Sequence, residues 1–400
     1  MDLGQPAPNN VTADAINQYL TDHSFVAAGL GSVFLQAQAT YGVDANYLVS
    51  HAMEETGVGV NTSSIAIAKN NLYGYGAFDA NASQDAGTFP SEAYAILFQA
   101  WEVRNNYLNP GASHYVSPTL AGMADNYASD PQWANQVNNL MDQFALYLHD
   151  TVHSYPQYDP SQPVTPPPAG SAALPQYRIA GATATIGTDA AYGRVIPVYA
   201  DAASGQNHMF TRTLSIGDQG ADVEILQRAL NQQMGTNIAT DGQFGPKTQS
   251  LLEQYQTAHG LPATGTCDFH LWDQVLDLSD PLTTVTSGQT VEIDAMAMGM
   301  AGSTATLWDH IPDVGWVDAN DITFQNVVRL SVSDWGSPSA VQIPVYDGSG
   351  DRIATLHAGD YVVRTAAADG QQAIQFTNPA TGAVETGYVP ASVTLTPVSR

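Results

Sequence analysis

Seven prolines lie between Pro156 and Pro175, among serine, threonine, glycine and alanine residues. Because proline fixes φ and has no amide proton, a segment so rich in it forms neither a helix interior nor a central strand. The composition is typical of an extended, semi-rigid linker. An ordered loop inside one domain is the alternative, but structureless inserts of this length are rare in compact domains. The sequence therefore predicts that residues 153–177 separate two differently folded parts of the chain.

Length and charge limit what these parts do. At 400 residues the chain is long enough for about two to four domains, each with its own core. It has 11 basic and 38 acidic residues and a formal net charge of −27. Such a surface repels nucleic acid and anionic lipid, so we expect a neutral, zwitterionic or cation-bridged partner. No stretch approaches the roughly 20 apolar residues of a membrane-spanning helix, so no membrane insertion is expected.

The single cysteine, Cys267, excludes an intramolecular disulfide, and no group of histidines and cysteines has metal-ligand spacing. We therefore expect no metal and no organic cofactor. The start of the chain contains neither a basic segment nor an apolar run, so we expect a signal peptide to be absent or already removed. We expect a monomer.

Capping and stop signals predict a mainly helical domain over residues 25–152, preceded by an N-terminal tail at residues 1–24. Asp44 caps a helix that Gly57 ends, and Ser91 caps another. The predicted helices cover residues 26–41, 45–56 and 92–108, with two more that start at Ser117-Pro118 and Asp130-Pro131. Residues 70–87 are rich in glycine and asparagine without a helical period, which predicts an irregular lobe.

Two adjacent carboxylates, Glu54 and Glu55, lie near the end of the second predicted helix. Leu48, Ala52 and Glu55 share one helical face, so the Glu55 carboxyl is expected to be partly desolvated beside the negative end of the helix dipole. Both effects help a carboxyl to keep its proton, which suits a general acid. Glu54 points about 100° round the helix and is expected to be more exposed. Taken alone, the periodicity also fits a solvated acid at a frayed helix end.

The segment Glu55-Thr56-Gly57, followed by Asn71-Leu72-Tyr73-Gly74, resembles the glucosaminidase family of peptidoglycan hydrolases, which cut the glycan strand of the bacterial cell wall. The resemblance implies a lysozyme-like, mainly α catalytic domain with Glu55 as the catalytic acid. It implies that Asn71 and Tyr73 bind substrate and that Tyr127 faces the acid. One departure is Val58, which stands where the family commonly has tryptophan, and this puts one sugar contact in doubt.

Glycoside hydrolysis usually needs a second carboxylate. Asp79, Asp85 and Glu92 are the candidates near the irregular lobe, and attack by the substrate's own N-acetyl oxygen is the alternative. Tyr75 and Phe78 could stack on sugar rings or pack in the core.

Other ring side chains near these segments have more ordinary interpretations. Trp101 follows a helical stripe and is expected to lie in the core. His51 and His114 are expected to be packed or solvent-facing residues rather than partners of the acid.

Beyond the proline-rich segment the chain shows two further types of sequence pattern. Residues 214–281 contain Asp222-Val223, Leu226-Gln227, Asp241-Gly242, Phe244-Gly245 and Trp272 in an order that resembles the small three-helix peptidoglycan-binding domain. The remaining residues alternate as strands do, and they carry a weak repeat. Ile196-Pro197-Val198-Tyr199 recurs at residues 343–346, and Gly315-Trp316-Val317 recurs as a glycine, an aromatic residue and a valine at residues 387–389.

The repeat resembles bacterial SH3-like wall-binding modules, which are small β-barrels. One module is expected at residues 338–400. The other would be split, with residues 178–213 and 282–325 forming one barrel around the inserted three-helix domain. This hypothesis requires that Val198 and Val317 lie in the same compact unit.

Together these resemblances imply a multidomain hydrolase of bacterial peptidoglycan that cleaves the β-1,4 bond on the N-acetylglucosamine side. A muramidase or lytic transglycosylase acting on the same glycan is one alternative, and a non-catalytic wall-binding protein is another. We expect a secreted or wall-associated protein, and a phage lysin is also compatible with the start of the chain.

Overall fold

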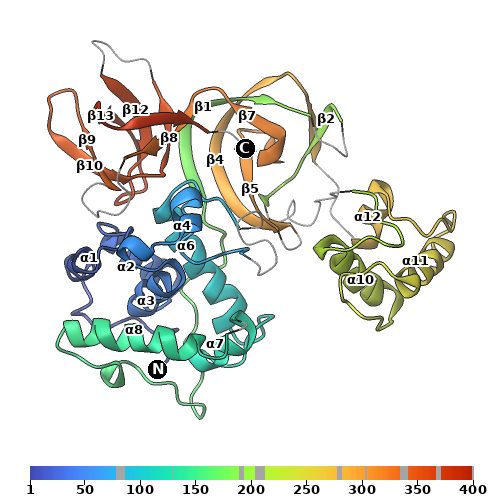
Figure 1. The fold of residues 1–400 in the computed structure, drawn as a ribbon, viewed down its shortest axis with the longest axis horizontal. Coiled ribbons are helices and arrows are strands. Elements are labelled where there is room, and N and C mark those ends of the chain that lie inside the picture. Colours follow the sequence, from blue (N-terminus) through green and yellow to red (C-terminus); the bar gives the residue numbers. More distant parts are fainter. Residues whose placement is uncertain are drawn as a thin grey trace.

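The computed structural model describes residues 1–77, 86–128, 130–188, 193–202, 212–276, 282–301, 304–333, 341–365 and 371–398. Figure 1 shows a helical body that contains the N-terminus, two sheet-rich bodies beside it, and a small helical body to one side. Within the described residues, no helix is both long and apolar enough to cross a membrane.

The helical body confirms the predicted helix around the candidate acid. Helix α3 covers Ala45–Thr56, and the Asp44 carboxylate accepts a hydrogen bond from the Tyr47 amide at 2.9 Å. Gly57 ends the helix with φ +73, a conformation that favours glycine. The other helices of this body are α1 (Ala13–Asp22), α2 (Gly31–Tyr41), α4 (Ser64–Lys69), α6 (Glu92–Val103), α7 (Leu120–Tyr127) and α8 (Trp133–Tyr147). Short turns of other helix types cover Gly59–Asn61, Arg104–Leu108 and Val152–Ser154.

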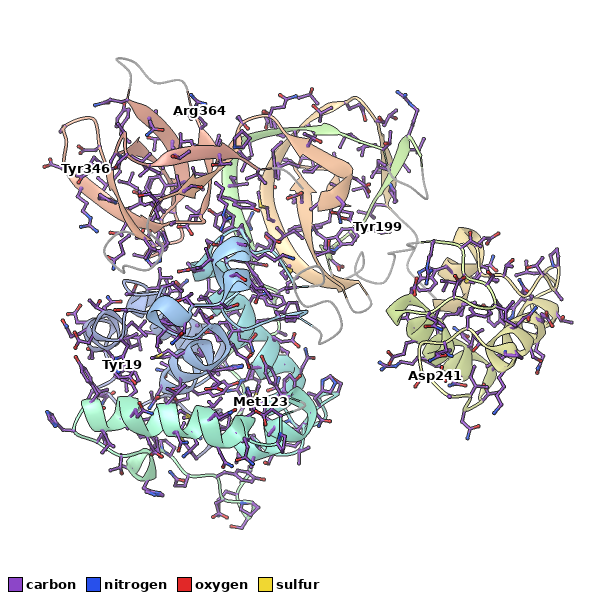
Figure 2. The ribbon with its side chains drawn as sticks, in the orientation of Figure 1. Tyr19, Met123, Tyr199, Asp241, Tyr346 and Arg364 are labelled. Carbon is purple, nitrogen blue, oxygen red and sulfur yellow. The ribbon has the colours of Figure 1, made fainter. Side chains whose placement is uncertain are left out.

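The first residues are part of this body rather than the tail that we expected. Helix α1 buries Ile16, Tyr19 and Leu20 in the main core. Tyr19 stacks on Phe144 of α8 with ring centroids 4.5 Å apart, and Figure 2 shows it among the helices. The Leu3 amide also donates to a backbone carbonyl near α7, at 2.8 Å. These apolar residues at helical spacing stabilise the body, and the interpretation as a tail overlooked them.

The proline-rich segment lies against α6 instead of standing free. Tyr94 donates its hydroxyl proton to the Pro175 carbonyl at 2.9 Å, and the Trp101 indole donates to the Ala172 carbonyl at 3.0 Å. Asn105 donates to the Ser171 carbonyl at 2.9 Å. Prolines remove backbone donors but leave the carbonyl acceptors in place, so side chains of α6 and of the turn that follows it can hold an irregular segment.

The first sheet-rich body is built from both sides of the three-helix region. Strands β1 (Tyr177–Ile186), β4 (Thr290–Ala301), β5 (Thr304–Ile311), β6 (Gly315–Asp318) and β7 (Ile322–Phe324) form an antiparallel sheet in the order β6-β5-β4-β1-β7. Strands β2 (Val195–Val198) and β3 (Thr283–Thr286) pair separately. Val198 and Val317 share one core cluster, as the split-module hypothesis requires.

The second sheet-rich body begins earlier than residue 338, where we expected it. Strand β8 (Val327–Ser331) pairs with both β11 (Tyr361–Arg364) and β14 (Thr394–Pro397). The remaining strands are β9 (Gln342–Tyr346), β10 (Arg352–His357), β12 (Gln372–Thr377) and β13 (Val384–Val389), in the sheet order β10-β9-β13-β12-β11-β8-β14.

The repeated segments make equivalent contacts in the two bodies. Tyr199 pairs with Trp316 in the first, and Tyr346 pairs with Tyr388 in the second. Each aromatic partner follows a glycine that has no room for a side chain. A Cβ added at residue 315 would lie 2.5 Å from the carbonyl oxygen of residue 199, and one at residue 387 would lie 2.9 Å from that of residue 346. The two bodies therefore share a strand pairing that requires close backbone approach.

The small helical body comprises α10 (Ala221–Met234), α11 (Pro246–Ala258) and α12 (Phe269–Leu276), which confirms three helices in this region. Its core cluster, from Leu214 to Val275, contains no described residue of another body. Figure 2 shows this body, with Asp241, lying apart from the others.

Candidate active site

The Glu55 carboxylate is held by one oxygen and open at the other. The Trp133 indole of α8 donates to Oε1 of Glu55 at 2.9 Å. Glu55 keeps 25% of its side-chain surface exposed, so solvent reaches a carboxylate that the protein has already oriented. The Thr56 hydroxyl donates to the Leu72 carbonyl at 2.7 Å and ties the helix end to the loop that follows.

Glycine at position 74 leaves space beside the open oxygen. A Cβ there would lie 3.4 Å from Oε2 of Glu55, and φ of Gly74 is +64. Within the part of the chain that the structure describes, no hydrogen-bond donor lies on this oxygen. Oε2 is thus the atom of Glu55 best placed to exchange a proton with a bound substrate.

His51 lies one turn before the acid and is fully buried. Its Nε2 is 3.4 Å from Oε1 of Glu55 but is poorly aligned for a hydrogen bond. Tyr47 places its hydroxyl 3.0 Å from Nδ1 and 3.2 Å from the sulfur of Met123, which Figure 2 labels. The imidazole is therefore a packed residue in contact with the acid, and it acts on the carboxylate from the protein side.

Tyr127, at the end of α7, packs against His51 and Trp133. Its ring stacks on Trp133 at 4.7 Å and meets the edge of His51 at 4.9 Å. Gln99 donates to its hydroxyl at 3.3 Å. Burial, and then the charge of Glu55, raise the pKa of Tyr127 well above its ordinary value. The phenol therefore stays protonated, and its hydroxyl donates a long hydrogen bond to the Tyr73 carbonyl at 3.5 Å.

Glu54 was expected to be more exposed than Glu55, but it is not an exposed residue. Its side chain is half-buried, and burial, followed by the charges of Glu55 and Asp130, raises the pKa of Glu54. No hydrogen bond to an indole holds it among the described contacts.

Asn71 and Tyr73 have internal partners, contrary to the substrate-binding role that the resemblance implied. The Asn71 amide donates to the carbonyls of Tyr75 and Gly87, at 2.8 and 3.0 Å, and accepts from the Tyr75 amide at 2.9 Å. Tyr73 is 3% exposed and donates to the Leu48 carbonyl at 3.1 Å. Both side chains shape the loop from within, because their polar groups are already hydrogen-bonded.

Tyr75 also packs inside, with its ring at the edge of Phe98 at 4.7 Å. Phe78, Asp79 and Asp85, which we proposed for stacking or catalysis, lie outside the described residues.

Glu92 is not free to assist the acid. Its Oε2 lies 3.0 Å from Nδ1 of His357 in the second sheet-rich body, and both side chains are 2% exposed.

Glu102 is a carboxyl that the sequence interpretation missed. It lies on α6 one turn after Gln99, and burial raises the pKa of Glu102.

Trp133 is the most important residue that the sequence interpretation missed. It is the first residue of α8 and is 4% exposed. A signal was present, because Trp133, Val137, Met141 and Phe144 follow a helical stripe. A buried indole needs an acceptor for its N–H group, and the nearby carboxylate supplies one.

Comparison with known proteins divides the chain as the structure does. Residues 31–146 match the family described as mannosyl-glycoprotein endo-beta-N-acetylglucosaminidase, and residues 219–275 match a peptidoglycan-binding domain family. The chain therefore contains a glucosaminidase domain and a peptidoglycan-binding domain.

Individual relatives are each similar to about a third of this chain. A beta-N-acetylglucosaminidase of Bacillus subtilis is 31% identical over 36% of this chain and 19% of its own length. A bifunctional autolysin of Staphylococcus epidermidis is 30% identical over 34% of this chain and 12% of its own length. The crystal structure of autolysin E of S. aureus is 29% identical, covering 37% of this chain and 71% of that chain, with a TM-score of 0.30. The chain thus spans less than a fifth of the length of the two sequence relatives.

Proposed function

We propose that this chain hydrolyses bacterial peptidoglycan at the β-1,4 bond on the N-acetylglucosamine side, with Glu55 as the general acid. The observation that carries the proposal is the asymmetry of the Glu55 carboxylate. One oxygen accepts the Trp133 indole proton at 2.9 Å, whereas the other faces the space that Gly74 leaves open. A glycosidic oxygen placed beside Oε2 would receive the proton as the bond to the sugar breaks.

The surrounding residues support this role for the acid. Trp133 holds the carboxylate by a hydrogen bond and His51 packs against the same oxygen, which preserves the geometry of the acid during the reaction. We propose that the protonated Tyr127 hydroxyl donates to charge that develops beside the acid, or to the attacking water. The positive charge that develops on the sugar would be stabilised by the substrate's N-acetyl oxygen or by a carboxylate outside the described residues.

The other domains would hold the enzyme on its insoluble substrate. The three-helix domain belongs to a peptidoglycan-binding family, and we propose the two sheet-rich bodies as SH3-like wall-binding modules, because their repeated strand pairing is equivalent. Attachment raises the local concentration of the catalytic domain without new catalytic contacts. We accordingly propose that the protein acts outside the cell, at the wall.

The proposal is tested with Glu55→Gln and digestion of purified cell walls. Loss of a general acid should lower the rate about 10²–10⁴-fold. The matched control is Glu54→Gln, which should retain most of the activity. Released fragments should carry N-acetylglucosamine at their reducing ends. A muramic acid or anhydro end would assign the other bond or a transglycosylase, and an active Glu55→Gln variant would remove Glu55 from the mechanism.

A further inference from the structure

The second sheet-rich body touches the catalytic domain beside the loop that borders the acid, here called the acid loop (residues 70–77). We propose that this body positions the acid loop for catalysis, in addition to any role in wall binding. The inference rests on the proposed function, because it concerns turnover at Glu55.

The first contact is at Asn70, where α4 ends. Asn70 has φ +51 and is 1% exposed, and its amide donates to the carbonyls of Gly359 and Phe89 at 2.8 and 3.0 Å. Gly359 has φ +100, and a Cβ added there would lie 2.0 Å from Oδ1 of Asn70. Only glycine allows this approach, so the sheet-rich body and the start of the acid loop fit each other closely.

Further contacts fix the segments on both sides of the acid loop. The Arg329 guanidinium of β8 donates to the Ile67 carbonyl of α4. The Tyr361 amide of β11 donates to the Pro90 carbonyl, which precedes α6, at 2.8 Å. The sheet-rich body therefore holds the chain both before and after the lobe.

A fourth pair lies beside these contacts. His357 at the end of β10 contacts Glu92, the first residue of α6, at 3.0 Å, and both are buried. A buried, hydrogen-bonded pair of this kind makes separation of the two bodies costly, because each group would lose its partner.

From Asn70 the acid loop leads directly to the acid. The next residue, Asn71, uses its amide to fold the loop onto Tyr75 and Gly87. Three residues further, Gly74 lies beside Oε2 of Glu55. A shift at the domain contact is thus transmitted over a few residues to the position where the glycosidic oxygen would bind. Displacements of about 1 Å at such positions can lower rates by about 10²-fold.

A module that only binds the wall would behave differently. Its loss would reduce attack on insoluble walls but leave turnover of a short soluble glycan unchanged. The proposal predicts a loss of kcat on a substrate too short to reach any wall-binding module.

The decisive comparison is Gly359→Ala against Gly350→Ala, with a soluble tetrasaccharide of alternating N-acetylglucosamine and N-acetylmuramic acid. Gly350 lies in the same body with φ +88 and has open space around it, so its substitution has a similar backbone cost without touching Asn70. We expect kcat to fall about tenfold or more for Gly359→Ala with little change in KM, and to stay near the parent value for Gly350→Ala. Equal kcat values for the parent and a folded Gly359→Ala variant would overturn the proposal.

Asn70→Gly covers the case in which Gly359→Ala fails to fold. Glycine accepts the left-handed conformation of residue 70 but removes both amide hydrogen bonds. It should lower kcat on the tetrasaccharide while wall binding, measured by sedimentation with purified walls, is unchanged. Parent-like kcat in this variant would contradict the proposal.

Hydrogen exchange of the acid loop separates this inference from the proposed function. Peptides covering residues 70–77 should exchange faster in Gly359→Ala or Asn70→Gly than in the parent and Gly350→Ala. If the parent does not cleave the glycan, the proposed function fails and exchange alone decides whether the contact orders the loop. Unchanged exchange would show that it does not.

Discussion

Single residues around Glu55 show how a helix end becomes an oriented acid. The Trp133 indole holds one carboxylate oxygen, His51 touches the same oxygen, and Gly74 leaves the other uncovered. A hydrogen bond contributes about 0.5–1.5 kcal/mol to stability when both groups are neutral and about 1.5–3 kcal/mol when one is charged. The indole is therefore expected to matter for turnover although it is not acidic or basic.

Replacing Trp133 by phenylalanine removes the donor and keeps an aromatic ring. We expect kcat on a soluble glycan to fall about tenfold or more, because the carboxylate loses its fixed orientation. The matched control is Trp101→Phe, whose indole donates to Ala172 in the proline-rich segment instead. Steady-state kinetics on both variants check the prediction, and equal kcat values would contradict it.

At the scale of elements, helix α1 completes the core of the helical body. It precedes the matched residues 31–146 and still buries three apolar side chains against α8 and neighbouring helices. A fragment that starts after α1 would expose this surface, so α1 belongs to the same folded unit as the matched residues.

Ile16→Ala tests the role of α1. Ile16 is fully buried, so its truncation should lower the free energy of unfolding by about 2–5 kcal/mol. Gln18→Ala on the exposed face of the same helix should change it by less than about 0.5 kcal/mol. Urea unfolding followed by tryptophan fluorescence gives both values, and a small effect at Ile16 would show that α1 is dispensable.

At the scale of the whole molecule, the bodies differ in how firmly they are joined. One core cluster contains Tyr94 and Phe98 of the helical body together with residues from strands of both sheet-rich bodies. The Tyr94 hydroxyl also accepts from the Met298 amide of β4 at 2.8 Å. The three-helix domain, in contrast, has a core of its own. The two chain segments that connect it to the first sheet-rich body lie side by side, since the Leu282 amide donates to the Val198 carbonyl at 2.8 Å.

Excision of residues 203–281, with a short glycine-serine connection, should therefore leave the rest folded. We expect an unchanged melting temperature of the remaining bodies and unchanged kcat on a soluble glycan, but weaker sedimentation with cell walls. A large loss of soluble activity would show that the three-helix domain supports the active site.

The contact between the catalytic domain and the second sheet-rich body should respond to pH. The pKa of Asp360 is raised to about 7, chiefly by burial and to a smaller extent by the charge of Glu92, while His357 and Arg329 act in the opposite direction. Burial opposes the charge of His357, yet the hydrogen bond that its imidazole donates to Glu92, together with the charges of Glu92 and Asp360, raises the pKa of His357 overall. Between about pH 4 and 7 the folded protein thus holds a proton on Asp360 that the unfolded chain has released, and above the ordinary pKa of histidine it also retains one on His357, so stability falls as pH rises.

The free energy of unfolding is expected to fall from pH 5 to pH 8, at up to about 1.4 kcal/mol per pH unit for each retained proton. Asp360→Asn should reduce this slope and raise stability at pH 8. The slope should not vanish, because burial also raises the pKa of Asp44 to about 7. Denaturant titrations at several pH values test this, and an equal slope in Asp360→Asn would contradict it.

Local signals in the sequence predicted the parts of the fold that depend on neighbours along the chain. Helix α3 has the predicted bounds because its cap at Asp44 and its stop at Gly57 are properties of the local backbone. Helix α2 starts at Gly31, five residues later than predicted, because no capping residue marks its start. The recurrence of Val198-Tyr199 and Val345-Tyr346 indicated two related strand pairings, since close backbone approach demands the same residue types.

The candidate site was predictable only as far as the acid itself. Helical phase and the residues after it selected Glu55, but Asn71 and Tyr73 could not be recognised as internal from their types. Whether an amide or a phenol faces solvent depends on which carbonyls the folded chain brings to it.

The sequence by itself thus determined which regions are helical, three-helix or strand-rich, the strand repeat and the choice of Glu55 over Glu54. Periodicity and capping decide these features because they act over a few residues. Only the tertiary structure decided that Trp133 holds the acid, that residues 1–24 belong to the core, and that Gly359 reaches the acid loop. Each of these joins segments far apart in the chain, and such contacts arise from packing and shape rather than from local preference.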